Sequence, residues 1–299
     1  MRKILKDIFI KLFLILYQLL KIKYLLKIFH INIIRRTKII NTRMNGIISI
    51  ENDTKIKDSY LLGKININNN TIIENTFFEG KIEIGVNAKI NNSNIKGIIQ
   101  IGNETYIENA NISGNIIIGN NSKITEKDVI LNGNIEIGNY TSLNGSNLDV
   151  YTYINKVKIG NFCSIARNVS IQEYNHKTNR VSSYFMSSNI FNASMLDDII
   201  TKGDIIIEND VWIGTQCVIL SGSHISTGAV IATNSVVTGY IPPYAIAGGN
   251  PAKIIKFRFS ESEIKELLNL RWWNWDIDKI KRNKEFFLSE SVEINKIIE

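Results

Sequence analysis

Residues 207–236 read IENDVW-IGTQCV-ILSGSH-ISTGAV-IATNSV, which is five consecutive six-residue units that each begin with isoleucine. The fifth position of each unit is always small or β-branched: Val211, Cys217, Ser223, Ala229 and Ser235. Short repeats of this kind cannot bury an apolar face alone, so they stack on their neighbours around a continuous core. The stretch therefore predicts a solenoid whose first and fifth positions point inward.

A second register, of 17 residues, lies nearer the N-terminus. Five glycines recur every 17 residues: Gly46, Gly63, Gly80, Gly97 and Gly114. Four residues after each glycine stands an isoleucine: Ile50, Ile67, Ile84, Ile101 and Ile118. Coils of about 18 residues built from six-residue sides have three short strands each, stacked about 4.8 Å apart. We therefore expect an all-β solenoid, a parallel β-helix with three-sided coils and an aliphatic core.

Composition agrees with a folded chain of this type. The 299 residues are 44% hydrophobic and 21% charged, which excludes a disordered chain. Asparagine is abundant, and it tolerates the left-handed backbone of tight corners. Two cysteines provide no disulfide framework, and Cys163 and Cys217 occupy the small inward position of their units, so we interpret both as core residues. The net charge of +7 favours anionic partners.

Four segments are predicted along the chain: an amphipathic helical segment over 1–40, N-terminal coils over 41–150, six-residue-repeat coils over 151–257 and C-terminal helices over 258–299. In residues 1–34 lysines gather on one side of a broad apolar helix, which either lies on an anionic membrane surface or packs on the solenoid or a sister subunit. In the last segment, SESE at 260–263 is a capping box, and we expect the helix that follows to cover the last coils. Trp272, Trp273 and Trp275 are interpreted as its packing anchors.

The repeat is interrupted once in the C-terminal coils. Six-residue units run from Ile159 to Ile171 and resume at Ile205, so residues 172–204 are predicted to leave the solenoid as a loop. Long loops on a rigid scaffold often carry function, and this one contains His176. Of the other two histidines, His30 lies in or just after the N-terminal helix, and His224 is expected at a solvated corner.

The surroundings of His176 carry a family resemblance. Asn175-His176 is followed by VSSYF at 181–185, preceded by IGNFCSIA from Ile159, and succeeded by DVWIG from Asp210 and PPYAIAGGNPAK at 242–253. In combination, over roughly residues 151–280, these motifs resemble the xenobiotic acetyltransferases, a branch of the hexapeptide-repeat acyltransferases. The resemblance implies a left-handed parallel β-helix, acetyl-CoA as co-substrate, a homotrimer with clefts between subunits, and no metal.

The resemblance also implies roles for individual residues. His176 would be the general base for direct attack by an acceptor hydroxyl, a task that suits imidazole. Its ring would be oriented by a main-chain carbonyl or, second in order, by Glu173. Residues at matching positions would hold acetyl-CoA: Thr215, Thr233, Thr238, Lys253 and Lys256. Residues beside His176 are assigned to the acceptor: Tyr174, Asn175 and Tyr184.

Three functions remain open at this point. The first is O-acetylation of a bacterial surface glycan or its lipid-linked precursor, favoured by the cationic N-terminal segment, which would place a cytoplasmic protein on the inner face of the membrane. The second is a soluble acetyltransferase that inactivates an antibiotic of the chloramphenicol or streptogramin type. The third is a non-catalytic scaffold. Nucleic-acid binding is disfavoured because the lysines cluster in the N-terminal helix without interleaved aromatic platforms.

Overall fold

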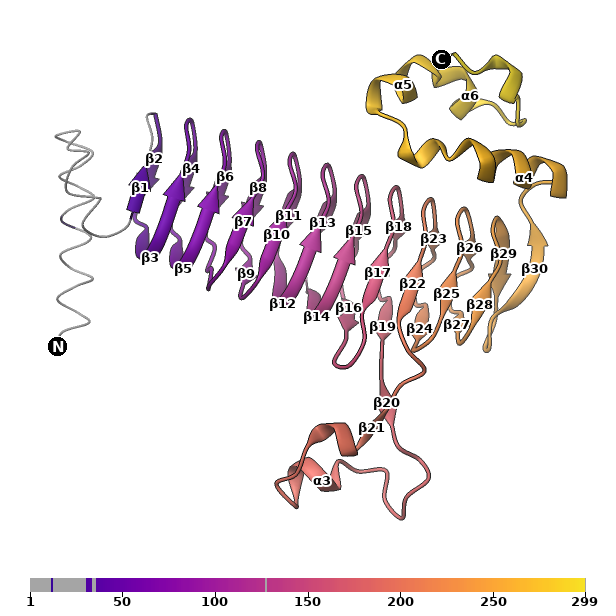
Figure 1. Cartoon of the computed structure of the whole chain (residues 1–299), viewed down its shortest axis with the longest axis horizontal. Coiled ribbons are helices and arrows are strands. Elements are labelled where there is room, and N and C mark those ends of the chain that lie inside the picture. Colours follow the sequence, from indigo (N-terminus) through magenta and orange to yellow (C-terminus); the bar gives the residue numbers. More distant parts are fainter. Residues whose placement is uncertain (1–11, 13–30, 34–35, 127, 299) are drawn as a thin grey trace.

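The computed structural model describes residue 12 and residues 31–33, 36–126 and 128–298. Of the helical segment predicted over residues 1–40, only Leu12 and residues 31–33 and 36–40 are described, and the prediction is wrong at its end, because β1 (Ile31–Ile33) and β2 (Lys38–Ile40) are strands of the solenoid sheets. None of the helices in the described part of the chain has the length and hydropathy that crossing a membrane requires. The described chain forms one long solenoid in which successive coils stand side by side (Figure 1).

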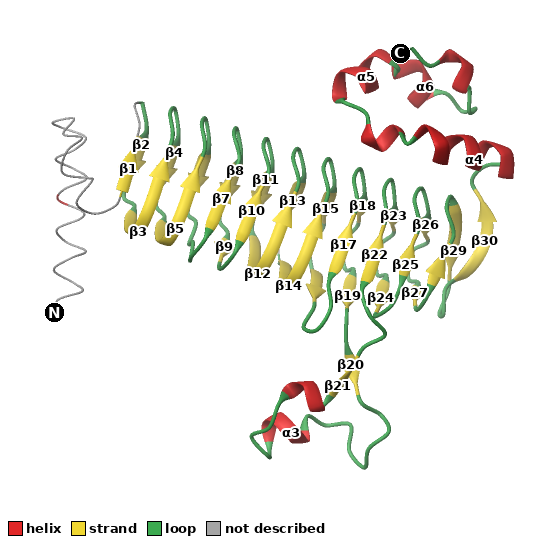
Figure 2. Ribbon diagram, in the orientation of Figure 1, coloured by secondary structure: helices red, strands yellow, loops and turns green. Residues whose placement is uncertain are grey.

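Two large sheets form the three sides of the solenoid, and within both the strands of successive coils pair in parallel (Figure 2). The 12-stranded sheet follows one side: β2 (Lys38–Ile40), β4 (Lys55–Lys57), β6 (Ile72–Glu74), β8 (Lys89–Asn91), β11 (Tyr106–Glu108), β13 (Lys123–Thr125), β15 (Ser142–Asn144), β18 (Ser164–Ile165), β23 (Trp212–Ile213), β26 (Val230–Ile231), β29 (Ala245–Gly248) and β30 (Lys253–Phe257). The 16-stranded sheet bends around the other two: β1 (Ile31–Ile33), β3 (Arg43–Ile50), β5 (Tyr60–Ile67), β7 (Ile82–Ile84), β9 (Asn94–Ile95), β10 (Ile99–Ile101), β12 (Ala110–Ile118), β14 (Val129–Ile137), β16 (Leu148–Tyr151), β17 (Val157–Ile159), β19 (Ser170–Gln172), β22 (Ile205–Ile207), β24 (Val218–Leu220), β25 (His224–Ile225), β27 (Val236–Val237) and β28 (Tyr240–Ile241).

The predicted registers hold at the level of single residues. Gly46 pairs with Gly63, and Ile84 pairs with Ile101 one coil later. The isoleucines of the 17-residue register are all buried, as are the first and fifth positions of the six-residue units. Cys163 and Cys217 lie in the same core, and burial raises the pKa of the Cys163 thiol to about 12. The core prediction is therefore confirmed.

Asparagine ladders hold one set of corners together. The Oδ1 of Asn103 accepts a hydrogen bond of 2.8 Å from the Val86 amide, and Asn103 in turn donates from its own amide to Asn120 Oδ1 at 2.7 Å. The same link recurs at Asn139 and Asn161, so it continues from the N-terminal coils into the six-residue-repeat coils. Because each side chain satisfies a backbone donor that the sheet leaves free, the abundance of asparagine has a structural cause.

The C-terminal segment forms the helices α4 (Glu261–Leu270), α5 (Ile277–Arg282) and α6 (Lys284–Leu288). The predicted capping box at Ser260 and Glu263 is present at the start of α4. Trp272 packs at 5.0 Å from Phe162, whose ring stacks on Tyr140 at 4.9 Å. The tryptophans are therefore packing anchors, as predicted.

The way in which this segment protects the solenoid differs from the expectation. The free edge of β29 is paired by the antiparallel strand β30, whereas the helices lie along a corner of the last coils (Figure 1). Arg258, which directly follows β30, connects this strand to earlier coils, because its guanidinium donates hydrogen bonds to the Gly228 carbonyl at 2.7 Å and to Asp210 at 3.2 Å. Burial raises the pKa of Asp210, although the neighbouring guanidinium opposes the shift.

Candidate active site

The loop that interrupts the repeat projects from one corner of the solenoid (Figure 1). β19 ends at Gln172 and β22 begins at Ile205, as the repeat pattern predicted. Outside the solenoid the two arms of the loop pair as the antiparallel strands β20 (Asn175–His176) and β21 (Ile199–Ile200), in which His176 lies opposite Ile199. The loop continues into the short helix α3 (Met186–Asn189). His176 is therefore held on a paired strand.

The imidazole of His176 has a defined orientation. Its Nδ1 lies 2.7 Å from the backbone carbonyl oxygen of Ser183, and the ring of Phe185 meets it edge-on at 4.3 Å between centroids. A carbonyl oxygen can only accept a hydrogen bond, so the proton of the neutral ring is on Nδ1. Nε2 then carries the free lone pair, and the residue is exposed. The expectation that a main-chain carbonyl orients the ring is confirmed.

Glu173, the second candidate for orienting the ring, has a different role. Its side chain is fully buried and accepts hydrogen bonds from the backbone amides of Tyr153 and Ile154, each at 3.0 Å, and from Asn155 Nδ2 at 2.7 Å. Burial alone would raise the pKa of this carboxyl, but hydrogen bonds, with Thr201 the foremost, outweigh burial and lower it. Glu173 therefore joins the base of the loop to the corner of the preceding coil and does not orient His176.

The residues assigned to the acceptor divide into two groups. Tyr174 is half-buried, with its ring edge-on to Tyr153 at 6.3 Å, and Asn175 donates from Nδ2 to Ser221 Oγ at 3.3 Å. Both are directed to the solenoid side of the loop. Tyr184 is 54% exposed and follows the residue whose carbonyl holds His176. Of the three, Tyr184 is the most accessible to a ligand.

Most of the residues assigned to acetyl-CoA lie at another corner. Thr215 and Thr233 belong to successive turns of this corner, where the amide of Asn234 donates to the Thr215 carbonyl at 2.9 Å. The Thr215 hydroxyl donates to the Arg167 carbonyl at 2.9 Å. Gly214 is buried against the next turn of this corner, since a Cβ there would lie 2.8 Å from the Thr233 amide nitrogen.

The basic residues lie on the adjoining strand. Lys253 is exposed and pairs with Gly248 across β29–β30. Gly248 packs close to Ala232, the residue before Thr233, since a Cβ on Gly248 would lie 3.0 Å from the Ala232 Cβ. Lys256 is also exposed and pairs with Ile246. The structure therefore brings Lys253 close to the corner of Thr215 and Thr233, with exposed cations suited to phosphate groups.

Thr238 lies at the corner from which the loop emerges, directly after β27, whereas Thr233 precedes the same strand. The neighbouring strand β24 repeats this arrangement, with Thr215 before it and Ser221, the partner of Asn175, after it. A strand of three residues spans roughly 10 Å. The His176 corner and the Thr215 corner are thus opposite edges of one face of the solenoid.

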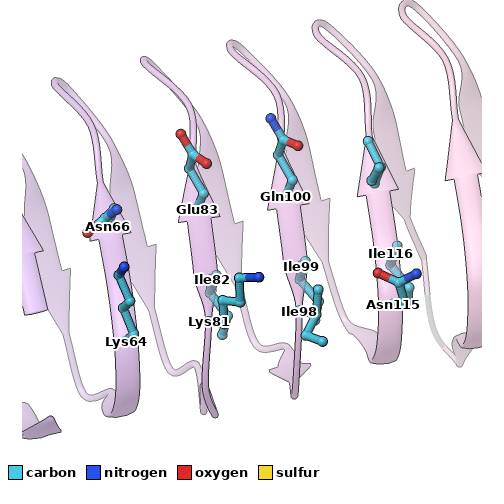
Figure 3. A pocket seen from close by; sticks show the side chains of 11 residues that line it. Lys64, Asn66, Lys81, Ile82, Glu83, Ile98, Ile99, Gln100, Asn115 and Ile116 are labelled. Carbon is cyan, nitrogen blue, oxygen red and sulfur yellow. The ribbon is translucent and has the colours of Figure 1, made fainter. Parts of the chain in front are cut away.

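One hollow of the surface lies away from both corners. A groove of about 290 Å³ crosses β5, β7, β10 and β12 in the N-terminal coils, where Lys64, Lys81 and Ile98 line it (Figure 3). None of the predicted site residues contributes to this groove.

Two features escaped the sequence analysis. His224 was expected at a solvated corner, but it begins β25 and its Nε2 lies 2.7 Å from Glu208 Oε1. The 18-residue spacing could have shown this, because it aligns His224 with Ile206, two residues before Glu208. The second feature is Asp198, a carboxylate only 4% exposed within the loop. No repeat extends into the loop, so the sequence contained no signal for its contacts.

Comparison with known proteins relates this arrangement to characterised enzymes. No family model matches the chain. A chloramphenicol acetyltransferase of Klebsiella aerogenes is 37% identical over 54% of this chain and 86% of its own length. A virginiamycin A acetyltransferase of Staphylococcus aureus is 37% identical over 57% of this chain and 84% of its own length. A probable macrolide acetyltransferase of Lysinibacillus sphaericus is 41% identical over 47% of this chain and 82% of its own length.

Among solved structures, a polysialic acid O-acetyltransferase covers 75% of this chain and 88% of its own, at 23% identity and a TM-score of 0.35, a likeness too low to support an argument about function. The sequence relatives are similar over most of their length, and the loop and repeat units that carry the resemblance are in place in the structure. The chain therefore belongs to the hexapeptide-repeat acetyltransferase family of these relatives, and its parallel β-helix is the solenoid that the repeat units predict.

Proposed function

We propose that this enzyme transfers an acetyl group from acetyl-CoA to a hydroxyl of a bacterial surface glycan or its lipid-linked precursor, with His176 as general base. The observation that carries the catalytic part is the hydrogen bond of 2.7 Å between Nδ1 and the Ser183 carbonyl, which leaves Nε2 exposed and able to accept a proton. The hydroxyl oxygen attacks the thioester carbonyl carbon while its proton passes to Nε2. The C–S bond then breaks, and the thiolate leaves and takes up that proton. General-base assistance of this kind contributes typically about 10²–10⁴-fold.

The corner of Thr215 and Thr233 would hold acetyl-CoA, together with Thr238. Thr233 and Thr238 are exposed, which supports this role because a ligand can reach both side chains. Lys253 and Lys256, both exposed, would meet the phosphate groups as point charges. Tyr174, Asn175 and Tyr184 would border the acceptor.

A homotrimer would complete the site. β20 and β21 carry His176 away from the solenoid (Figure 1), whereas Thr215 and Thr233 lie at the far edge of the same face and Thr238 at the edge next to the loop. A neighbouring subunit placed against this face would convert two separate edges into walls of one cleft. Mass measurement in solution tests this assembly, since a monomer at working enzyme concentration would contradict it.

The choice of a glycan acceptor depends on residues 1–34. Their lysines and apolar side chains form a sequence pattern suited to an anionic membrane surface, where lipid-linked precursors are found. We propose that this segment places the enzyme on the cytoplasmic face of the membrane. Removal of residues 1–30, which precede β1, should release it from anionic vesicles and spare turnover of a water-soluble acceptor. Undiminished vesicle binding by the shortened chain would contradict the anchoring role.

A second candidate acceptor is an antibiotic, and one observation favours it. The sequence relatives include proteins named for chloramphenicol and for virginiamycin A. The direct test is thiol release from acetyl-CoA in the presence of oligosaccharides, chloramphenicol or a streptogramin, with each product identified by mass. Acetylated oligosaccharide as the preferred product supports the first proposal, and efficient turnover of an antibiotic alone replaces it with the second. Absence of turnover with every acceptor of the panel would favour the non-catalytic scaffold.

A further inference from the structure

The loop around His176 is organised by one carboxylate. Asp198 lies directly before β21 and is 4% exposed. Its Oδ1 accepts a hydrogen bond of 3.0 Å from the Ser187 amide, and its Oδ2 accepts two from Ser188, at 2.9 Å from the amide and 3.1 Å from the hydroxyl. The guanidinium of Arg180 lies 3.5 Å from Oδ1. All of these hydrogen-bond and ion-pair partners of the carboxylate belong to the same loop.

These contacts fix the start of α3. The amides of Ser187 and Ser188 belong to the first turn of that helix, where backbone donors have no partner within the helix. Burial alone would raise the pKa of Asp198, but the hydrogen bonds from Ser187 and Ser188 lower it to about 2. The side chain is therefore ionised at neutral pH, and charge-assisted bonds of this type are about twice as strong as neutral ones.

Asp198 is connected to His176 from both sides, through its carboxylate on one and through its backbone carbonyl on the other. Phe185, whose ring contacts the imidazole at 4.3 Å, is the residue from which α3 begins. Ser183, whose carbonyl faces Nδ1, lies two residues earlier. On the other arm, the Asp198 carbonyl accepts a hydrogen bond of 3.0 Å from the amide of Lys177, the residue after His176. Asp198 thus joins the strand that carries the imidazole to the segment that orients it.

We propose that Asp198 is a positioning residue, which fixes the tautomer and direction of His176 by holding residues 183–188 against the ring. The proposal rests on the role of His176 proposed above. Asp198 itself does not touch the imidazole or the reacting atoms. Without its charge, the start of α3 loses its strongest bonds, so the Ser183 carbonyl is free to leave Nδ1. Nδ1 and Nε2 can then exchange the proton, and the fraction of enzyme with a basic, correctly aimed Nε2 falls.

The test compares Asp198→Asn with Asp197→Asn in the full-length chain. The neighbouring Asp197 carboxylate is exposed and makes none of the contacts described for Asp198, so its variant controls for loss of a charge at this point of the loop. The first readout is the pair kcat and KM for acetyl-CoA. We expect Asp198→Asn to lower kcat about 10–100-fold, the range typical of partners that orient a functional side chain, with KM changed less than about twofold.

The second readout is the tautomer of His176, measured by ¹⁵N NMR of ring-labelled protein and assigned with the His176→Ala variant. We expect Nδ1 to be protonated in the unmodified enzyme and in Asp197→Asn, and a mixture of tautomers in Asp198→Asn. An unchanged tautomer in Asp198→Asn overturns the proposal, whether kcat falls or not, because a merely structural role predicts that result. Unchanged kcat also overturns it. The NMR readout needs no turnover, so failure of the general-base proposal would be seen separately, as full activity of His176→Ala.

Discussion

Glu173→Gln is expected to destabilise the junction between the loop and the solenoid. The glutamate Oε2 accepts from two backbone amides and Oε1 accepts from Asn155 Nδ2, all within a fully buried environment. Glutamine can keep its oxygen on the two amides, but its NH2 group then faces the NH2 group of Asn155, and the charge assistance is lost. Weakening two charge-assisted bonds and leaving one buried donor without an acceptor costs about 2–4 kcal/mol.

The effect should also depend on pH in a defined direction. The folded pKa of Glu173 is lowered from its usual value, so the unfolded chain binds the proton more readily. The stabilising contribution is therefore present above the unfolded pKa of about 4.3 and is lost as pH falls through the folded pKa. The difference between the two proteins should accordingly shrink in acid.

Hydrogen exchange measures this change where it occurs. At neutral pH the amides of Tyr153 and Ile154 should exchange faster in Glu173→Gln, together with a lower denaturant midpoint. Glu83→Gln, which removes an exposed carboxylate from the N-terminal coils, is the matched control and should leave both unchanged. Equal protection of the two amides in Glu173→Gln and the unmodified chain would refute the reasoning, as would a stability difference that persists undiminished in acid.

Three further predictions concern the solenoid. Gly63→Ala should lower the free energy of unfolding in denaturant by about 1–3 kcal/mol or more, because the φ of Gly63 is +92° and a Cβ would lie 2.6 Å from the Gly80 Cα. Gly80→Ala is the control and should be tolerated, because a Cβ on Gly80 meets open space. Arg258→Ala should lower stability by about 1–3 kcal/mol, seen as a melting temperature lower by several degrees, and equal melting would contradict its role at the β30 junction. Cys163 and Cys217 should react with a thiol reagent only as fast as the chain unfolds, since burial raises the pKa of both, and rapid labelling of native protein would contradict the packing.

The sequence predicted those parts of the molecule that repeat. The spacing of Gly46 and Gly63, or of Ile84 and Ile101, is repeated through the coils of the 17-residue register, since a slip of one residue within a strand would move each side chain to the other face. The same periodicity located the loop, because residues 172–204 are where it fails. It also contained the position of His224 beside Glu208, which an alignment at 18 residues would have revealed.

The interior of the loop could not be predicted in this way. The contacts of Asp198 join residues about ten positions apart with no periodicity, and Glu173 reaches a corner twenty residues earlier. Both carboxylates are buried among amide donors, which the loop supplies to Asp198 and the corner of the preceding coil supplies to Glu173. The position of the C-terminal helices was equally hidden, since β30 reverses direction to pair with β29 before α4 begins.

Turnover of His176→Ala is the most direct test of the general-base mechanism. Thiol release from acetyl-CoA should fall by at least about 10²-fold in this variant, with its circular dichroism and unfolding midpoint unchanged because the residue is exposed and its ring bonds only one carbonyl. His224→Ala, which removes the other histidine of the described chain, should keep its activity and serves as the control. Turnover by His176→Ala close to that of the unmodified enzyme would contradict the account, because the proton of the acceptor would then have to leave by another route.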